Sequence, residues 1–291
     1  MRMLEPILHE KLMSLLREDI GMGDITTEAI VPAETEARAQ IIVKEPAVIA
    51  GLLESSIIFR MIGVKFHARV KDGAEVAGGT VLAEINGKAQ AILSAERTAL
   101  NILMRMSGIA TMTRRLVKMI REAGLNVRIA ATRKTAPGLR YFDKKAVMIG
   151  GGDPHRFRLD DALLIKDNHI RIAGGIKEAV RRARSSASFS KKIEVEVQTE
   201  EEALEAAEAG ADIIMLDNMT VKEAERVLKA LEDAGLRSRV AIEISGGINE
   251  SNLLDYARLN PDVISLGSLT HSVRAVDISL EVVEVAKGES S

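Results

Sequence analysis

Short apolar runs alternate with amphipathic stretches along the second half of the chain. The apolar runs occupy residues 127–132, 162–167, 192–197, 212–217, 239–245 and 262–267. Stretches with apolar residues at helical spacing lie between several of them, at residues 176–186, 199–210 and 220–235. Buried strands that alternate with amphipathic helices predict a parallel sheet with helices on its outside.

The predicted strands carry chemically useful groups at their C-terminal ends. These groups are Arg133 and Lys134, Lys166 and Asp167, Glu196, Asp217, Ser245, and Gly267. Such groups at many strand ends are typical of α/β barrels, whereas an open doubly wound sheet gathers its ligand groups at one switch point. The pattern therefore favours a TIM-like α/β barrel. Since six strands are fewer than eight, either further strands are hidden in the pattern or the barrel is incomplete.

The first half of the chain has a different rhythm. Helical spacing predicts helices at residues 1–19 and 52–63. Turn residues separate three predicted strands, at residues 37–51, 64–73 and 80–93. The segment 94–123 has a helical period broken only by Gly108, which marks the expected domain boundary.

One part of this half resembles another class of protein. Residues 70–93 are similar to the repeated pattern of lipoyl and biotinyl carrier domains. A carrier needs a modifiable lysine at a hairpin, and Lys88 lacks the neighbours expected there. A structural β-layer is therefore the favoured interpretation.

Composition narrows the classes of function. The chain has 291 residues, 46% of them apolar and 28% charged, with a formal net charge of −2. This charge and the scarcity of aromatic residues argue against nucleic-acid binding. The absence of cysteine excludes disulfides, thiolate metal sites and a cysteine nucleophile. With no signal-peptide pattern or membrane-span pattern, a cytoplasmic protein is expected.

A local excess of positive charge follows the first predicted strand. Seven cations stand there with two acids, the cations being Arg133, Lys134, Arg140, Lys144, Lys145, Arg156 and Arg158. Because arginine binds carboxylate or phosphate through paired hydrogen bonds, Arg133 and Lys134 are expected to bind an anion. For Lys144, Lys145 and Arg158 a solvated surface is the favoured interpretation.

Two further motifs extend this positive region. The glycine-rich run 150–156 either approaches a ligand closely or forms a tight loop. Lys166 stands at the tip of a predicted strand and could bind phosphate as a point charge. The alternative, a lysine that reaches into solvent, is weaker beside Arg133 and Arg156.

Acidic groups share one face of the neighbouring strands. Glu194 and Glu196 alternate, so both point to the same side, and Asp217 ends the next strand. Buried acids need cations or a metal as partners. Glu196 and Asp217 are expected to orient hydroxyl groups or to hold Mg²⁺ through oxygen, whereas a structural salt bridge is favoured for Glu194.

Two loops after the last predicted strands are typical of phosphate sites. A Ser-Gly-Gly turn begins at Ser245, and Gly267 with Ser268 follows the final strand. Barrels bind phosphate at these loops through backbone N–H groups. A sugar phosphate or nucleotide substrate is therefore expected.

An ordered set of motifs resembles the quinolinate phosphoribosyltransferase family. The motifs are ATRKTAPGLR, AVMIGGGDPHR, LIKDNH, EVEV, LDN, EISGGI and LGSLTHS, with REDIGMGDITT and SAERTALNILMRMSGIAT in the first half. The resemblance implies transfer of phosphoribosyl from phosphoribosyl pyrophosphate to quinolinate with decarboxylation. The products are nicotinate mononucleotide, pyrophosphate and CO₂, in de novo NAD biosynthesis.

The same resemblance implies the architecture of the subunit. It places an α/β sandwich at residues 1–108, an incomplete barrel of about seven strands at 109–271, and a C-terminal helix at 272–291 that packs on the N-terminal domain. It also implies a homodimer, or a higher oligomer built from dimers, in which each N-terminal domain covers the partner's active site.

Roles for individual residues follow from the matching positions. Lys134, Lys166, Glu196 and Asp217 are the implied catalytic residues, and Mg²⁺ is bound mainly through pyrophosphate, with Glu196 and Asp217 as candidate direct ligands. The implied substrate-binding residues are these four together with Arg97, which reaches the partner's substrate, Thr132, Arg133, His155, Arg156, His169, Ser245, Gly246, Gly247, Leu266, Gly267, Ser268 and His271.

Three other functions remain open at this stage. A relative that acts on nicotinate would need fewer cations for one carboxylate. A relative found with molybdenum transport genes shares much of the pattern. A phosphate-ligand sensor without catalysis would gain little from Glu196 and Asp217 beside a polyphosphate.

Overall fold

A computed structural model describes residues 3–286 and divides the chain into two compact units. Unit 1 contains the described residues up to 112, residues 141–150 and residues 273–286. Unit 2 contains residues 113–140 and 151–272. Residues 141–150 therefore lie in unit 1, although the domain bounds implied by the family resemblance placed them in the barrel.

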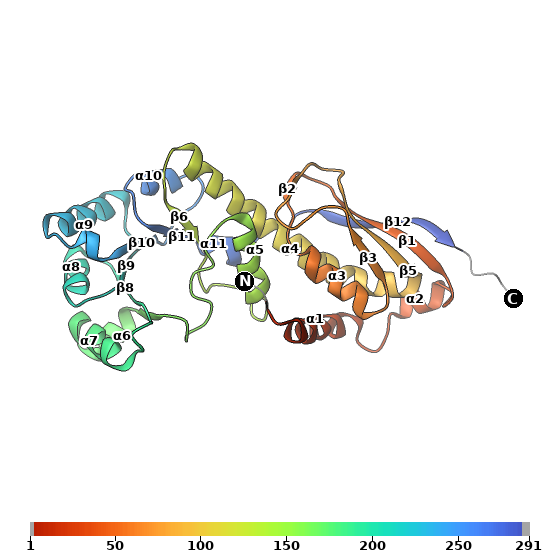
Figure 1. The fold of residues 1–291 in the computed structure, drawn as a ribbon, viewed down its shortest axis with the longest axis horizontal. Helices are drawn as coiled ribbons and strands as arrows, with labels where there is room; N and C mark the ends of the chain where they lie inside the picture. Colours follow the sequence, from red (N-terminus) through yellow and green to blue (C-terminus); the bar gives the residue numbers. More distant parts are fainter. Residues whose placement is uncertain (1–2, 287–291) are drawn as a thin grey trace. The chain divides into compact units, whose positions relative to one another are not determined.

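Unit 1 is a mixed α/β unit around a four-stranded sheet in the order β12-β1-β5-β3 (Figure 1). Its strands are β1 (Glu36–Val43), β3 (Lys65–Ala68), β5 (Val81–Lys88) and β12 (Ile278–Ala286), with a separate pair of β2 (Ala47–Val48) and β4 (Glu75–Val76). Its helices include α1 (Glu5–Ile20), α2 (Ile25–Ile30) and α3 (Leu52–Met61). Alternate residues of β1 are buried, as expected for a sheet with one covered face.

The predicted C-terminal helix is wrong for the residues that the structure describes. Residues 278–286 form strand β12, which pairs antiparallel with β1 from Ile278 opposite Val43 to Ala286 opposite Glu36. Its sequence, ISLEVVEVA, is rich in β-branched residues, which favour strands. Residues 287–291, the end of the predicted helix, lie outside the described part.

Helix α4 (Ala89–Glu122) continues through Gly108 without a break, so the predicted interruption there is also wrong. A Cβ atom on Gly108 would lie 2.1 Å from the carbonyl oxygen of Arg274. Glycine at this position therefore allows a second backbone segment to approach the helix closely.

Helix α5 (Arg140–Gly150) buries charged groups that were expected on a solvated surface. Lys144 is fully buried, and Nζ of Lys145 lies 2.7 Å from a carboxylate oxygen of the buried Glu54. Asp143 accepts hydrogen bonds of 2.7 and 2.9 Å from the guanidinium of Arg105. Arg158, by contrast, is exposed and pairs with its neighbour Asp160, as predicted.

Unit 2 contains a six-stranded parallel sheet in the order β6-β11-β10-β9-β8-β7. The strands are β6 (Arg128–Ala130), β7 (Leu163–Ile165), β8 (Ile193–Val197), β9 (Ile213–Asp217), β10 (Ala241–Ser245) and β11 (Val263–Ser265). All six strands predicted from the apolar runs are confirmed. Helices α6 (Asp167–Ala173), α7 (Ile176–Ser186), α8 (Glu200–Glu208), α9 (Val221–Asp233), α10 (Leu253–Ala257) and α11 (Ser268–His271), with the 3₁₀ turn η1 (Arg237–Arg239), complete unit 2.

The sheet has the strand order of an incomplete barrel. Asp153 forms an isolated parallel bridge with Ala130 on the free side of β6, where a further barrel strand would stand. β6 is followed in the sheet by β11, β10, β9, β8 and β7. Within residues 3–286 no pairing joins β7 to the segment of Asp153, so the barrel is not closed by hydrogen bonds there. Helices α7 and α8 cover the outer side of this sheet (Figure 1), so the predicted incomplete α/β barrel is confirmed.

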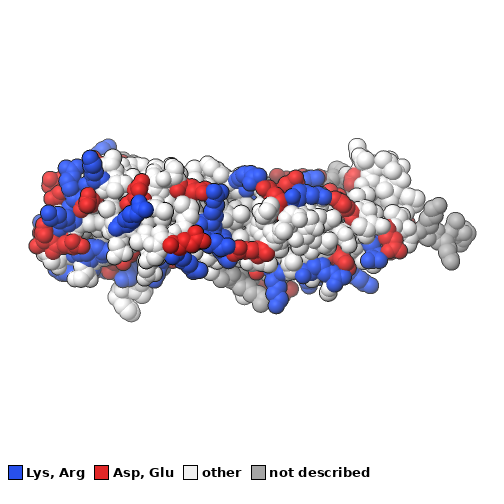
Figure 2. Space-filling model, turned by 90° about the horizontal axis from the view of Figure 1, so that it is seen from above, with Lys and Arg blue, Asp and Glu red and all other residues white. Residues whose placement is uncertain are grey.

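Charge and hydropathy agree with the composition. Basic and acidic side chains are intermixed on the face shown in Figure 2. Among residues 3–286, no helix combines the length and apolar character needed to cross a membrane.

Helix α9 offers a direct test of local structure. Thr220 caps it: the Thr220 side chain accepts from the amide of Glu223, and the Glu223 carboxylate accepts the Thr220 amide at 2.8 Å. Loss of an N-cap costs about 1 kcal/mol, so Thr220→Ala should lower the free energy of unfolding by that amount in urea denaturation. Thr220→Ser keeps the hydroxyl and should behave like the wild type; equal losses in both variants would contradict the capping role.

Candidate active site

A cavity of about 370 Å³ lies at the C-terminal ends of the barrel strands. Period-two alternation turns Glu196 of β8, Asp217 of β9 and Ser245 of β10 toward the barrel interior. Of the residues expected from the sequence, those that line this active-site pocket are Thr132, Arg133, Lys134, His155, Arg156, Lys166, Glu196, Asp217 and Ser245. The structure thus gathers most of the strand-end groups at one place, while Asp167 and Gly267 stand outside the lining of this pocket.

Cations and acids are paired across the pocket. Nζ of Lys166 lies 2.5 Å from a carboxylate oxygen of Glu196. The amide of Lys166 donates to Nδ1 of His169 at 3.0 Å, so the His169 side chain caps the N-terminus of helix α6. His169 lines an adjoining hollow of about 430 Å³, together with Lys166, Arg133 and Arg156.

Two arginines, Arg133 and Arg156, line the pocket together. Nε of Arg133 is buried and has no hydrogen-bond partner in the described structure. Arg156 donates to the carbonyl oxygen of Ala162 at 3.3 Å. Burial, and then the charge of Arg133, lower the pKa of Arg156, and the negative charge of Glu194 opposes them. Bound anions would relieve this repulsion.

The loop after β9 meets the Ser-Gly-Gly turn after β10. The amide of Asn218 donates to the carbonyl oxygen of Ser245 at 2.9 Å, and its side-chain amide donates to Asp217 at 3.0 Å. Gly246 has φ +91°, and a Cβ atom there would lie 2.2 Å from Oδ1 of Asn218. Only glycine fits this contact. Asn218 was not among the predicted site residues, although its LDN motif and the tolerance of asparagine for its φ of 57° could have indicated it.

The loop after β11 contacts the strand end of Lys134. Oγ1 of Thr270 donates to the carbonyl oxygen of Lys134 at 2.8 Å. A Cβ atom on Gly267 would lie 3.0 Å from the ring of His271 and 3.2 Å from the Lys134 side chain. Leu266 is buried, and its amide donates to the carbonyl oxygen of Ala130, so its side chain belongs to the barrel core.

Several expected residues stand outside the lining of the active-site pocket. They are Arg97, His169, Gly246, Gly247, Leu266, Gly267, Ser268 and His271. Arg97 belongs to unit 1, where its side chain is 59% exposed and lies 3.7 Å from Glu96. Its contact with a partner's substrate stays a prediction.

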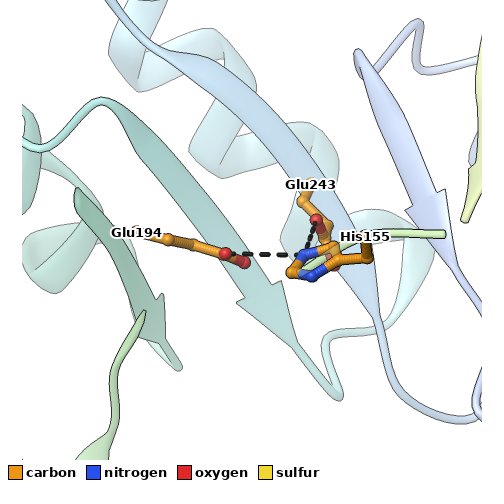
Figure 3. A group of neighbouring side chains, drawn as sticks. All are labelled: His155, Glu194 and Glu243. Carbon is orange, nitrogen blue, oxygen red and sulfur yellow. Dashed lines mark hydrogen bonds and ion pairs between the residues drawn. The ribbon is translucent and has the colours of Figure 1, made fainter. Parts of the chain in front are cut away.

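His155, Glu194 and Glu243 form a cluster (Figure 3), and two of them, His155 and Glu243, line the active-site pocket. Nε2 of His155 lies 3.1 Å from an oxygen of Glu243 and 3.4 Å from an oxygen of Glu194. The structural pairing favoured for Glu194 from the sequence takes the form of this contact with His155. Glu243 was missed, although its alternation with Ser245 on β10 places both on the inward face.

The proton of the His155 ring can be placed from these contacts. Burial alone would lower the pKa of His155, but hydrogen bonds to Glu194 and Glu243, and their charges, raise it to about 10. However, Nδ1 accepts the amide of Arg156 at 2.7 Å, which requires a bare Nδ1. This hydrogen bond places the ring proton on Nε2, because a second proton, on Nδ1, would have to displace the Arg156 amide.

The cluster has the residue types of a metal site, but its hydrogen bonds favour another use. His155, Glu194 and Glu243 each offer a ligand atom within 4.8 Å of the others. A histidine that binds a metal through Nε2 needs its ring proton on Nδ1. Here the Nε2 proton is donated to the carboxylates instead. Oε1 of each glutamate has no hydrogen-bond partner in the described residues, at a cost of about 1–3 kcal/mol for each atom.

A second cavity, of about 960 Å³, opens at the N-terminal ends of the same strands. Its lining includes Arg128 of β6 and Ala241 of β10, and it shares His155, Arg156 and Glu243 with the active-site pocket. Barrels usually fill this interior with side chains. The His155 cluster therefore stands between two hollow spaces.

Comparisons with known proteins cover nearly the whole chain. Models of the N-terminal and C-terminal domains of quinolinate phosphoribosyl transferase match residues 24–107 and 109–281. A probable nicotinate-nucleotide pyrophosphorylase [carboxylating] of Methanocaldococcus jannaschii is 50% identical over 283 residues, covering 97% of this chain and 99% of that protein. The human nicotinate-nucleotide pyrophosphorylase [carboxylating] is 38% identical over 281 residues, covering 96% and 93%. The crystal structure of NadC from Streptococcus pyogenes matches with a TM-score of 0.88 and 37% identity, covering 98% of this chain and all of that one.

Proposed function

The chain belongs to the quinolinate phosphoribosyltransferase family, and we propose that it transfers phosphoribosyl from phosphoribosyl pyrophosphate to quinolinate with loss of CO₂. The products are nicotinate mononucleotide, pyrophosphate and CO₂, a step of NAD biosynthesis. The observation that carries the proposal is the active-site pocket, in which Arg133, Arg156 and Lys166 face Glu196 and Asp217. A dianionic heterocycle and an activated ribose need these two kinds of charge side by side.

The cations provide sites for both substrates. Quinolinate carries two adjacent carboxylates, which Arg133 and Arg156 would neutralise with charge-assisted hydrogen bonds. Lys134 and Lys166 would bind the pyrophosphate group as point charges. The turns at Ser245 and Gly267 would bind the 5-phosphate through backbone N–H groups.

The acids act on the sugar. Departure of pyrophosphate develops positive charge on the ribose, and Glu196 and Asp217 would stabilise that charge and bind the ribose hydroxyls. A preorganised carboxylate aimed at a developing charge is worth most in a site shielded from water. Because the ring nitrogen of quinolinate attacks the anomeric carbon itself, the protein supplies position and charge rather than a nucleophile.

Decarboxylation follows from the same charge change. Once alkylated, the ring nitrogen is positively charged and stabilises the electron pair that stays on the adjacent ring carbon as the neighbouring carboxylate departs as CO₂. A proton from water then replaces CO₂ on the ring carbon. The arginines that orient the dicarboxylate also keep this ring in place for the second step.

The donor set fits Mg²⁺. Magnesium prefers oxygen ligands and usually binds through one or two carboxylates plus substrate phosphates. Glu196 and Asp217 place carboxylates on neighbouring strands at the pocket, and pyrophosphate would supply further oxygens. When bound, the ion would neutralise charge on the leaving pyrophosphate.

A homodimer is part of the proposal. Arg97 carries an exposed guanidinium in the ERT motif, and its matching position in the family reaches the partner's substrate. Arg97→Ala should then weaken quinolinate binding only in assembled protein. Analytical ultracentrifugation, together with mixing of Arg97→Ala chains with Arg133→Ala chains, tests this, because shared sites would recover activity in mixed dimers.

The deciding assay uses purified protein with quinolinate, phosphoribosyl pyrophosphate and Mg²⁺. Nicotinate mononucleotide and CO₂ should appear in equal amounts, and a chelator in place of Mg²⁺ should slow the reaction. With nicotinate instead of quinolinate, no CO₂ can form. Turnover of nicotinate alone would favour the monocarboxylate relative, and inertness toward both would contradict the proposal.

A further inference from the structure

Two buried glutamates of the barrel interior have no role in the chemistry described so far. Glu194 on β8 is 1% exposed and Glu243 on β10 is 2% exposed. Both carboxylates converge on His155 (Figure 3), and Oε1 of each has no hydrogen-bond partner among the described residues. Replacement of buried ionic groups by apolar side chains of similar size is often neutral or stabilising. Stability of the barrel therefore does not explain why glutamates stand at these two positions.

A series of contacts leads from these carboxylates to Arg156. They accept the Nε2 proton of His155, whose Nδ1 accepts the amide of Arg156 at 2.7 Å. The backbone of His155 has φ +53°, which residues other than glycine rarely adopt. Its own amide is fixed by Asp153 at 2.7 Å. The glutamates thus hold the side chain of His155 in place, and His155 directs the backbone that leads into Arg156.

Charge acts in the same direction. Arg156 lies close enough to Arg133 for their mutual repulsion to lower its pKa, and Glu194 opposes this effect. The negative charge of Glu194, together with the charges of Glu196 and Asp161, therefore opposes the repulsion between the two arginines before a dianion binds. A site that is already in its binding geometry loses less conformational freedom on binding.

We infer that Glu194 and Glu243 are positioning residues for the dicarboxylate: acting through His155, they hold Arg156 beside Arg133. The inference rests on the proposed function, since it assigns the two arginines to quinolinate. The glutamates contact His155 and so act on quinolinate binding, whereas Lys166 and Asp217 serve the phosphoribosyl half. The expected signature is therefore an effect on one substrate only.

The experiment compares the isosteric variants Glu194→Gln and Glu243→Gln with the wild type. KM for quinolinate should rise about tenfold in each, with KM for phosphoribosyl pyrophosphate within about twofold and kcat less affected than KM. The matched control is Glu54→Gln, because Glu54 is equally buried but pairs with Lys145 in unit 1. It should lower the melting temperature without changing KM for quinolinate.

A double-mutant cycle with His155→Gln tests the route of the effect. If the glutamates act through His155, the change in KM of His155→Gln/Glu243→Gln should be smaller than the product of the single changes. Nitrogen-15 NMR of the imidazole should also show a protonated Nε2 in the wild type. This spectrum does not depend on turnover.

Several outcomes would overturn the inference. They are an unchanged KM for quinolinate in folded variants, equal increases in KM for both substrates, and multiplicative effects in the cycle. The wild-type protein could instead bind one divalent metal ion per chain at the His155 cluster, with this binding lost in Glu243→Gln. That result would show that the cluster is a metal site and not a positioning device. Lack of quinolinate turnover by the wild-type protein would instead contradict the proposed function, and this inference with it.

Discussion

Replacement of Arg133 by alanine should lower kcat/KM for quinolinate. The corresponding loss of transition-state stabilisation should be about 1–3 kcal/mol or more, the range for loss of a charged hydrogen bond. Arg133 lines the active-site pocket, and its buried Nε has no partner within the described structure. A substrate carboxylate is the natural acceptor for such a donor. Truncation would also remove one of the two arginines that the proposed function assigns to the dianion. The loss should appear mainly in KM, measured by steady-state kinetics at saturating phosphoribosyl pyrophosphate.

Arg158→Ala is the matched control for this prediction. Arg158 lies in the same stretch of cations, but its side chain is 67% exposed and pairs with Asp160. Exposed ion pairs contribute little, so this variant should keep wild-type kinetics. If Arg133→Ala also keeps them, the assignment of the β6 strand end to quinolinate is wrong.

The barrel could be predicted from the sequence because its strands are buried on both sides. Buried parallel strands are nearly continuous apolar runs, as in residues 213–217 and 263–265. Strand β12 could not be identified in the same way. It is an edge strand with exposed Val282, Val283 and Val285, and a short apolar run of this kind does not distinguish strand from helix.

Burial of single charges depends on partners distant in sequence. Lys145 resembled a surface residue, but Glu54 lies 91 positions away and pairs with it. Gly108 resembled a helix break for a similar reason, because the segment at Arg274 that requires a glycine cannot be read from local pattern. Tertiary contacts, rather than propensity, decided both cases.

The candidate site was predictable where alternation alone placed the side chains. Glu196, Asp217 and Ser245 end parallel strands, and the parallel register brings them to the same edge. Glu243 was missed because alternation with Ser245 shows only that its side chain faces inward, and its role depends on a partner that is distant in sequence. That partner, His155, comes from a loop 88 residues earlier in the chain.

Glu196→Gln should lower kcat by about 10²-fold or more, the size expected when a preorganised electrostatic partner of the transition state is lost. Glutamine keeps the shape of Glu196 and can still accept from Lys166, which now lies 2.5 Å from the carboxylate. What disappears is the negative charge beside the ribose. That charge matters most when the sugar becomes cationic, so kcat should fall much more than KM for phosphoribosyl pyrophosphate rises.

The comparison with Glu225→Gln separates this effect from a general change in net charge. Glu225 is exposed on helix α9 and should have no influence on turnover. Pre-steady-state measurement of pyrophosphate release would show whether the slow step in Glu196→Gln is cleavage of the bond to the ribose. An unaffected kcat would remove Glu196 from the stabilisation of the sugar cation and leave its pairing with Lys166 as a purely structural contact. A fall in kcat with intact pyrophosphate release would move its role to the later loss of CO₂, which the proposed charge distribution does not predict.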